Sequence, residues 1–151
     1  MTALRTISTM FAVAVLATPV IADNHRPAGL AALGPPPVPV DNPMSDAKIE
    51  LGKLLFFDPI LSGNYGMPCS ACHLPDAGWA VQDKISFGYP GTTHWRNSQT
   101  IVNSAYYSKL FGAGASNSLQ SQARSAARGG VAGNGEDDMM EARLAFVPEY
   151  R

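Results

Sequence analysis

Apolar and polar positions divide the chain into an apolar beginning, a proline-rich stretch and a region of short amphipathic segments. In residues 1–22 the only charge is Arg5, which precedes a largely apolar run over 7–16 and small residues ending at Ala22. This order is typical of a secretory signal peptide cleaved after Ala22. The run is shorter than the roughly 20 residues of a bilayer-spanning helix, and Pro19 interrupts it. The pattern predicts an exported chain with no stable membrane span.

Residues 23–44 contain six of the prolines and few large apolar side chains, so we expect an extended, polyproline-like leader. Downstream, Ser45 is a candidate N-cap for a helix that runs through Phe57 and ends before Asp58 and Pro59. No stretch alternates as strands do. The pattern predicts an all-α domain over 45–151, with further helices over 70–73, 99–106, 118–128 and 136–147, and an irregular loop over 78–91.

Composition narrows the possible partners of the chain. The 151 residues carry 11 Lys and Arg against 12 Asp and Glu, which gives a net charge of −1. This balance excludes the basic surface that nucleic-acid binding requires. The length suits one folded domain after the leader.

The motif with specific chemistry is Cys69-Ser70-Ala71-Cys72-His73, the C-x-x-C-H pattern of c-type haem attachment. Two thiols one helical turn apart reach the two vinyl groups of one porphyrin, and the adjacent histidine lies beneath the iron. A disulfide or redox pair is the alternative for two exported cysteines, and a zinc site would need further Cys or His ligands. The motif predicts one covalent haem c on Cys69 and Cys72, with His73 as the proximal iron ligand, in a cytochrome c-like fold.

Several other residues fit a haem environment. Arg96 is a candidate partner for a haem propionate, with a surface ion pair as the alternative. Nine aromatic residues lie within about forty positions of His73 and could exclude water from a macrocycle: Phe56, Phe57, Trp79, Phe87, Tyr89, Trp95, Tyr106, Tyr107 and Phe111.

Together the run 51–62, the haem motif and Arg96-Asn97-Ser98-Gln99-Thr100 resemble the N-terminal haem domain of bacterial di-haem cytochrome c peroxidases and their methylamine-utilisation relatives. The resemblance covers about residues 45–151. It implies a periplasmic oxidoreductase in which one haem meets peroxide and a second, in a C-terminal domain, receives electrons from a small donor. This chain carries one C-x-x-C-H motif.

Three departures from the family pattern affect the expected chemistry. Tyr89 stands where family members often have a distal histidine, and Gly112 stands where they have a tryptophan. Ser121 replaces the glutamate expected to move protons during peroxide cleavage, which a serine hydroxyl does not do near neutral pH.

The residues leave four alternatives for the side of the iron opposite His73. Tyr89 matches by family position, His94 is the other histidine of the folded region, and Met139 or Met140 follows at a spacing typical of small His/Met cytochromes. An open or water-bound site is the fourth alternative.

Three classes of function fit these residues. Electron transfer by a mono-haem periplasmic cytochrome ranks first, because a held haem suffices for it. The alternative is peroxide reduction by a peroxidase subunit or fragment that works with a second haem domain. A non-catalytic haem-binding subunit is the third. The expected partner is a redox protein: a small cytochrome, a cupredoxin or a second-haem chain.

Overall fold

A computed structural model describes residue 29 and residues 31–151. The predicted signal peptide over 1–22 lies outside the described residues and, with the leader and the domain boundary at 45, stays a prediction. The chain divides into Met1–Leu33 and Gly34–Arg151, and the second unit contains every helix of the described part. Its α-helices are α1 (Asp46–Phe57), α2 (Leu119–Arg128) and α3 (Asp137–Phe146), and its 3₁₀ turns are η1 (Pro59–Leu61), η2 (Cys69–Ala71), η3 (Pro75–Ala77), η4 (Ser104–Tyr106) and η5 (Pro148–Tyr150).

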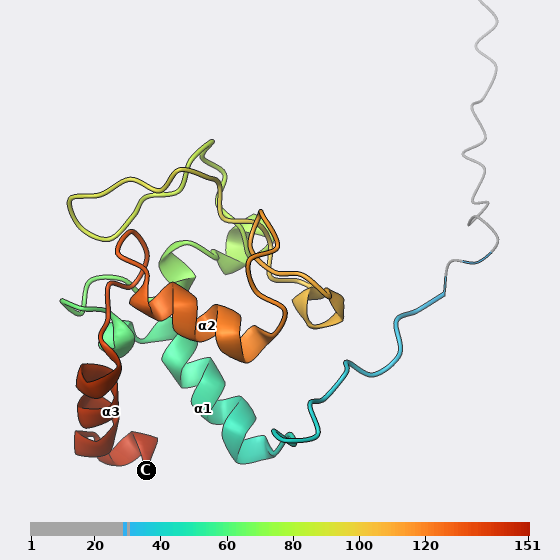
Figure 1. Ribbon diagram of the computed structural model, residues 1–151, viewed down its shortest axis with the longest axis horizontal. Helices are drawn as coiled ribbons and strands as arrows, with labels where there is room; N and C mark the ends of the chain where they lie inside the picture. Colours follow the sequence, from blue (N-terminus) through green and yellow to red (C-terminus); the bar gives the residue numbers. More distant parts are fainter. Residues whose placement is uncertain (1–28, 30) are drawn as a thin grey trace, which may run out of the picture. The chain divides into compact units, whose positions relative to one another are not determined.

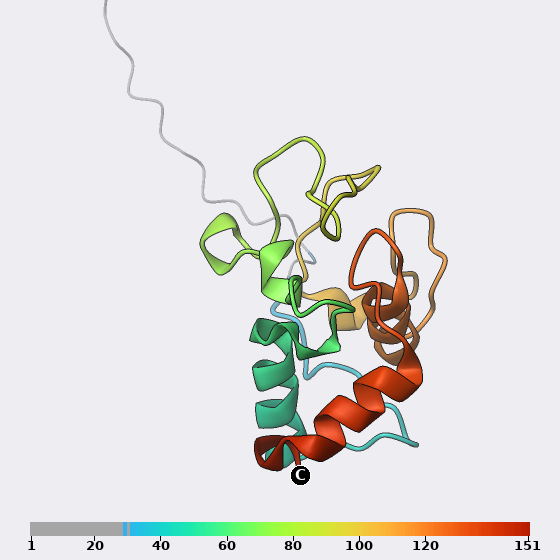
Figure 2. The ribbon, with the colours of Figure 1, turned by 90° about the vertical axis from the view of Figure 1, so that its left-hand side faces the viewer.

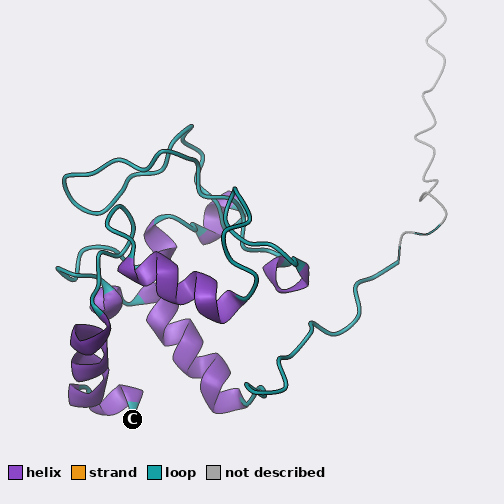
Figure 3. Ribbon diagram, viewed as in Figure 1, coloured by secondary structure: helices purple, strands orange, loops and turns teal. Residues whose placement is uncertain are grey.

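The described residues form helices and loops without a named strand, as the all-α prediction requires (Figure 1, Figure 3). Three isolated antiparallel bridges pin the loops: Leu74 with Ala80, Phe87 with Thr93 and Leu110 with Ser116. Both views show the long loop between η3 and η4 extending away from the helices (Figure 1, Figure 2). No helix in the described part of the chain is long and apolar enough to cross a membrane.

Helix α1 begins and ends as its sequence predicts. The Ser45 Oγ accepts a hydrogen bond from the Lys48 N–H at 3.3 Å and so satisfies one free amide of the first turn. At the other end Asp58 is extended, with φ −94° and ψ 130°, because the residue before a proline avoids the helical region. The Asp58 carboxylate then accepts from the Ile60 N–H at 2.7 Å and starts η1.

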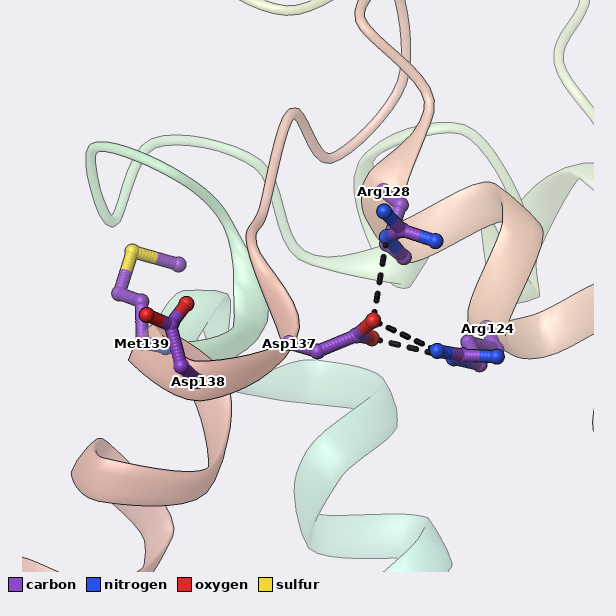
Figure 4. A network of polar contacts seen from close by, with 5 residues as sticks. All are labelled: Arg124, Arg128, Asp137, Asp138 and Met139. Carbon is purple, nitrogen blue, oxygen red and sulfur yellow. Dashed lines mark hydrogen bonds and ion pairs between the residues drawn. The ribbon is translucent and has the colours of Figure 1, made fainter.

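Helices α2 and α3 are joined by a shared carboxylate (Figure 4). Asp137, in the first turn of α3, lies 2.6 Å from Arg124 Nη2 and 3.4 Å from Arg128 Nε of α2. The hydrogen bond from Arg124 lowers the pKa of Asp137, and the same contact raises the pKa of Arg124. Asp137 also lies where a negative charge stabilises the N-terminus of a helix.

Two helix predictions need correction. The turn expected over 70–73 begins one residue earlier, since the N–H groups of Cys72 and His73 both donate to the Cys69 carbonyl. Only Ser104–Tyr106 of the helix expected over 99–106 is helical. The Thr100 hydroxyl donates to the Gly78 carbonyl and accepts from Val102 N–H, while Asn103 has φ +60°. These side-chain bonds and the left-handed residue replace the helical ladder.

The described residues bury few apolar side chains. Ile60, Leu110 and Met140 are the buried hydrophobic residues, and the two most enclosed side chains, Ser62 and Ser86, are hydroxyls at 1% exposure. Large apolar groups remain exposed around the haem motif and on α1: Ile49, Leu54, Phe57, Leu74, Ile85, Phe87 and Trp95. Polar contacts therefore carry much of the long-range structure.

Arg143 of α3 makes the densest of these contacts. Its Nη1 donates to the carbonyls of Ile60 at 3.0 Å and Ser62 at 2.6 Å, and its Nη2 donates to the Gly63 carbonyl at 3.1 Å. The guanidinium also lies 3.8 Å from the ring centroid of Tyr65. One side chain thus fixes the loop after η1 to α3 across about eighty residues of sequence.

A second contact joins the same two regions. The Tyr150 hydroxyl of η5 donates to the Asp58 carboxylate at 2.5 Å. This hydrogen bond to Asp58 is the main cause that raises the pKa of Tyr150 to about 12.

Replacement of Arg143 by Gln should lower the free energy of unfolding by about 3 kcal/mol, because three carbonyls lose a charged donor. Chemical denaturation followed by circular dichroism measures the change. Arg124→Gln is the matched control, since Arg124 is exposed and pairs at the surface. An equal loss in both variants would contradict the role assigned to Arg143.

Stability should fall as the pH rises from about 10 to about 12, because Tyr150 holds its proton more tightly when folded. The folded pKa lies above the unfolded value, so this contribution is complete below pH 10 and lost above pH 12. The Tyr150→Phe variant should show a weaker alkaline loss in this window in thermal unfolding. Tyr107→Phe is the control. An identical pH profile in Tyr150→Phe and the parent would refute the prediction.

Candidate haem site

The haem motif forms a tight turn that brings both thiols to one side of the chain. Cys69 opens η2 and Cys72 follows it, and the structure holds both as free cysteines, with Cys69 exposed. Desolvation raises the pKa of both thiols, and the neighbouring Cys72 adds to the rise at Cys69. Both sulfurs therefore keep their hydrogen near neutral pH.

His73 is oriented by a backbone carbonyl. Its Nδ1 lies 3.2 Å from the Trp79 carbonyl oxygen. A carbonyl oxygen only accepts, so this contact requires the ring proton on Nδ1 and leaves the lone pair on Nε2 free. This is the arrangement in which a histidine binds a metal through Nε2 while its other nitrogen donates to the protein.

The Trp79 peptide adopts an uncommon conformation to make this contact. Trp79 has φ +62°, a region that bulky residues rarely occupy, and its N–H donates to the Leu74 carbonyl at 2.8 Å. Phe56 packs edge-on to the Trp79 ring with centroids 5.6 Å apart, and Phe57 lies at 6.4 Å. Phe56 and Phe57, at the C-terminal end of α1, thus pack against Trp79, whose carbonyl orients His73.

His94 has the opposite arrangement. Its Nδ1 accepts a hydrogen bond from the Arg96 N–H at 3.2 Å, and its ring stacks on Trp95 with centroids 4.6 Å apart. Neutral His94 therefore carries its proton on Nε2, so neither nitrogen presents a free lone pair. The two histidines of the folded domain therefore differ in tautomer, and of the two only His73 keeps a free lone pair on a ring nitrogen.

The remaining distal candidates lie in separate parts of the fold. Tyr89 packs against the loop after η1, where its hydroxyl would lie 3.2 Å from a Cβ placed on Gly63. Met140 is buried in α3, with its sulfur 3.1 Å from a Cβ placed on Gly135, as a core residue. Met139 is half-buried on the same helix.

Two of the positions that depart from the family pattern are Gly112, which lies beside Arg96, and Ser121. The Arg96 Cδ is 3.3 Å from a Cβ placed on Gly112, so the arginine stem fills space that a larger residue at 112 would need. Ser121 opens a surface groove of about 430 Å³ on α2, together with Arg124, Ser125, Arg128 and Gly129.

These residues fit a covalently bound haem. Haem c requires two thiols, an iron ligand and apolar walls. The turn provides the two thiols, His73 provides a free Nε2, and exposed aromatic rings provide the walls. A shallow surface pocket of about 240 Å³ is lined by Ile101, Val102 and Trp79, the residue whose backbone carbonyl orients His73. Cys69 and Cys72 would attach the porphyrin and His73 would bind its iron.

A family model described as di-haem cytochrome c peroxidase matches residues 46–151, from the first residue of α1 to the end of the chain. The chain belongs to the di-haem cytochrome c peroxidase family. The matched residues include the haem motif and each candidate ligand, and membership of this family supports haem c as the cofactor.

Curated members of this family share much of the sequence. The chain is 62% identical over 139 residues to the cytochrome-c peroxidase IdrP1 of Pseudomonas sp. strain SCT, covering 92% of this chain and 36% of that protein. It is 63% identical over 121 residues to IdrP1 of Denitromonas iodatirespirans, covering 80% of this chain and 32% of that protein. The chain thus spans about a third of the length of these relatives.

A solved structure gives the same fold. A MauG-like protein associated with microbial copper homeostasis superposes with a TM-score of 0.73 and 32% identity, over 84% of this chain and 38% of that one. The all-α class predicted from the sequence is confirmed for the described residues, and their fold is that of a MauG-like protein.

The sequence pattern did not identify the groups that position the predicted ligands. Trp79 entered only as an aromatic wall, yet its backbone carbonyl orients His73. The sequence assigned no structural role to Arg143, which ties the loop beside Tyr89 to α3. Contacts made by backbone carbonyls, or by side chains distant in sequence, cannot be predicted from composition or from the spacing of residues.

The two histidines should respond differently to replacement. His73→Ala should keep haem attached through the thioethers, resistant to acid-acetone extraction, but shift the Soret band and spin state. His94→Ala is the matched control and should leave the ferric and ferrous spectra unchanged, because both nitrogens of His94 are engaged or protonated. A spectral change in His94→Ala equal to that in His73→Ala would contradict the tautomer assignment.

Proposed function

We propose that the chain is a periplasmic haem domain of a peroxidase that reduces hydrogen peroxide together with a second haem domain. Sequence reasoning ranked electron transfer first and peroxidase activity as its alternative. The peroxidase relatives at 62% and 63% identity favour the alternative. The observation that carries the proposal is the haem motif turn, in which His73 presents a free Nε2 beside two thiols.

In this proposal the residues of the chain bind the haem and orient its iron ligand. Haem, when bound, supplies the electron transfer and the activation of the peroxide O–O bond. Cys69 and Cys72 hold it covalently at one equivalent per chain, and His73 binds the iron from the proximal side. Trp79 fixes the His73 ring, while Phe56 and Phe57 fix Trp79. Arg96 is proposed to contact a propionate.

The opposite side of the iron is proposed to be open or to face Tyr89. His94 has no nitrogen free for iron in this arrangement, and the Met140 sulfur packs on Gly135. Tyr89 lies on a loop fixed at both ends, since its N–H donates to Val131 and its carbonyl accepts from Thr92. A vacant position is what peroxide needs in order to reach the iron.

Proton transfer is the step for which this chain is poorly equipped. Heterolysis of peroxide needs a group that takes a proton from one oxygen and delivers it to the other. Ser121 stands at the glutamate position of the family, and a hydroxyl does not exchange protons readily near neutral pH. The two arginines beside it in the groove, Arg124 and Arg128, offer hydrogen-bond donors and no acceptor. The chain alone should therefore turn over slowly.

A second haem domain is proposed as the source of electrons. Reduction of one peroxide to two waters consumes two electrons and two protons, and one haem motif is present in this chain. A small cytochrome or a cupredoxin would deliver the electrons to that second domain. Export to the periplasm, through the predicted signal peptide, would place the chain among such donors.

The decisive experiment is steady-state oxidation of a reduced small cytochrome by peroxide, using the haem-loaded chain. Turnover should be slow, and Ser121→Glu should raise it by about tenfold or more, since general acid/base catalysis commonly contributes about a hundredfold or more. Ser125→Glu, one turn away in the same groove, is the control and should leave the rate unchanged.

The same assay separates peroxidase activity from electron transfer. Addition of the second haem domain of the Pseudomonas relative should increase turnover by this chain. If neither that domain nor Ser121→Glu raised the rate above that of free haem, the peroxidase proposal would fail and electron transfer would return to first place.

A further inference from the structure

The Trp79 carbonyl, which orients His73, belongs to a turn in which the preceding peptide is held at both of its polar atoms. The peptide between Gly78 and Trp79 donates its N–H to the Leu74 carbonyl at 2.8 Å. The carbonyl of the same peptide accepts a hydrogen bond from the Thr100 hydroxyl at 2.6 Å. Because its donor and its acceptor both have partners, the orientation of this peptide is fixed.

The chain on the other side of Trp79 is anchored as well. The Ala80 carbonyl accepts a hydrogen bond from the Leu74 N–H at 3.0 Å. The Trp79 carbonyl therefore lies between two fixed peptides, and it is 3.2 Å from His73 Nδ1. Leu74 belongs to the turn itself, whereas Thr100 follows the turn by more than twenty positions. Thr100 thus anchors the turn from a different part of the chain.

The turn needs such an anchor because its backbone conformation is uncommon. Gly78 has φ +66° and Trp79 has φ +62°, so two successive residues are left-handed. A bulky residue keeps this conformation only where the surrounding contacts hold it. Without the hydrogen bond from Thr100, the peptide between the two residues is free to rotate, and the Trp79 carbonyl rotates with it.

The Thr100 hydroxyl is itself directed at the Gly78 carbonyl. A carbonyl oxygen only accepts, so the hydroxyl must donate its hydrogen to Gly78. The Thr100 oxygen also accepts a hydrogen bond from the Val102 N–H at 3.2 Å. The donor and an acceptor site of one hydroxyl are therefore both used within the chain.

Asn97 holds the same loop on the far side of Ala80. Its side-chain nitrogen donates to the carbonyls of Val81 at 3.1 Å and Asp83 at 2.6 Å. Asn97 and Thr100 both belong to the segment that resembles the family, and both of their side chains bind carbonyls of the loop that carries Trp79.

We propose that Thr100 is a positioning residue for His73, because its hydroxyl holds the peptide that aims the Trp79 carbonyl at His73 Nδ1. The inference rests on the proposed binding of haem iron by His73. A hydrogen bond donated by the second ring nitrogen raises the basicity of a metal-binding histidine. A more basic ligand stabilises ferric iron more than ferrous iron, so Thr100 lowers the reduction potential of the haem.

The test is redox potentiometry and proton NMR of the haem-loaded chain with Thr100→Val, which removes the hydroxyl and keeps the branched shape. At a fixed electrode potential the ratio of ferrous to ferric haem should rise about fivefold, the factor that one ordinary hydrogen bond sets in an equilibrium. At about 59 mV per tenfold for one electron, the reduction potential should rise by about 40 mV. Exchange of the His73 Nδ1 proton with solvent should accelerate by a similar factor.

Three further variants separate the hydroxyl from the rest of the fold. Thr100→Ser keeps the hydroxyl and should restore the parental potential and exchange rate. Asn97→Leu removes the donor on the far side of Ala80 and should raise both readouts, but less than Thr100→Val does. Thr93→Val is the matched control, since it makes the same change at an exposed threonine that makes none of these contacts, and it should alter neither readout.

A parental potential and exchange rate in Thr100→Val would overturn the inference. Equal changes in Thr100→Val and Thr100→Ser would also overturn it, because the hydroxyl would then not be their cause. A change in potential without faster exchange of the Nδ1 proton would reject the route through the Trp79 carbonyl and, with it, the inference.

If Thr100→Val does not accumulate, Asn97→Leu and Thr100→Ser decide. A higher potential with faster exchange in the first variant and parental values in the second support the inference, and any other pattern rejects it. Unchanged spectra in His73→Ala would instead refute iron binding by His73 and, with it, the proposed function.

Discussion

The limited burial of apolar side chains is the constraint on which the rest of this structure depends. With Ile60, Leu110 and Met140 as the buried hydrophobic residues of the described chain, burial alone holds the helices weakly together. Directed polar contacts compensate for this. Arg143 binds three carbonyls in η1 and the loop after it, and Asp137 joins α2 to α3. A haem bound among the exposed aromatics would add the missing apolar contacts.

The same constraint explains why the site is built from backbone as much as from side chains. Trp79 orients His73 through its carbonyl, and Phe87 reaches the Cys72 sulfur through its carbonyl. These carbonyls belong to irregular loops, whose polar groups are free for such contacts because no helix uses them. Long loops pinned by isolated bridges are therefore part of the haem site and not just connections between helices.

Sequence patterns predicted the parts of the fold that local chemistry specifies. Ser45 caps α1, and Pro59 and Pro148 follow the ends of α1 and α3, as expected. Ser118, expected as the first residue of its helix, is the N-cap of α2. The helix expected over 99–106 was wrong for most of its length. Its residues instead bind the Gly78 carbonyl, a partner more than twenty positions away that no local pattern indicates.

The sequence by itself determined the haem motif, the helical class and the family, because these depend on residue types at short spacing. Only the tertiary structure distinguished His73 from His94, since the tautomer of each ring depends on the partner of its Nδ1. It also separated Cys72, whose thiol contacts the Phe87 carbonyl, from the exposed Cys69. These differences arise from contacts between loops distant in sequence, which spacing along the chain does not encode.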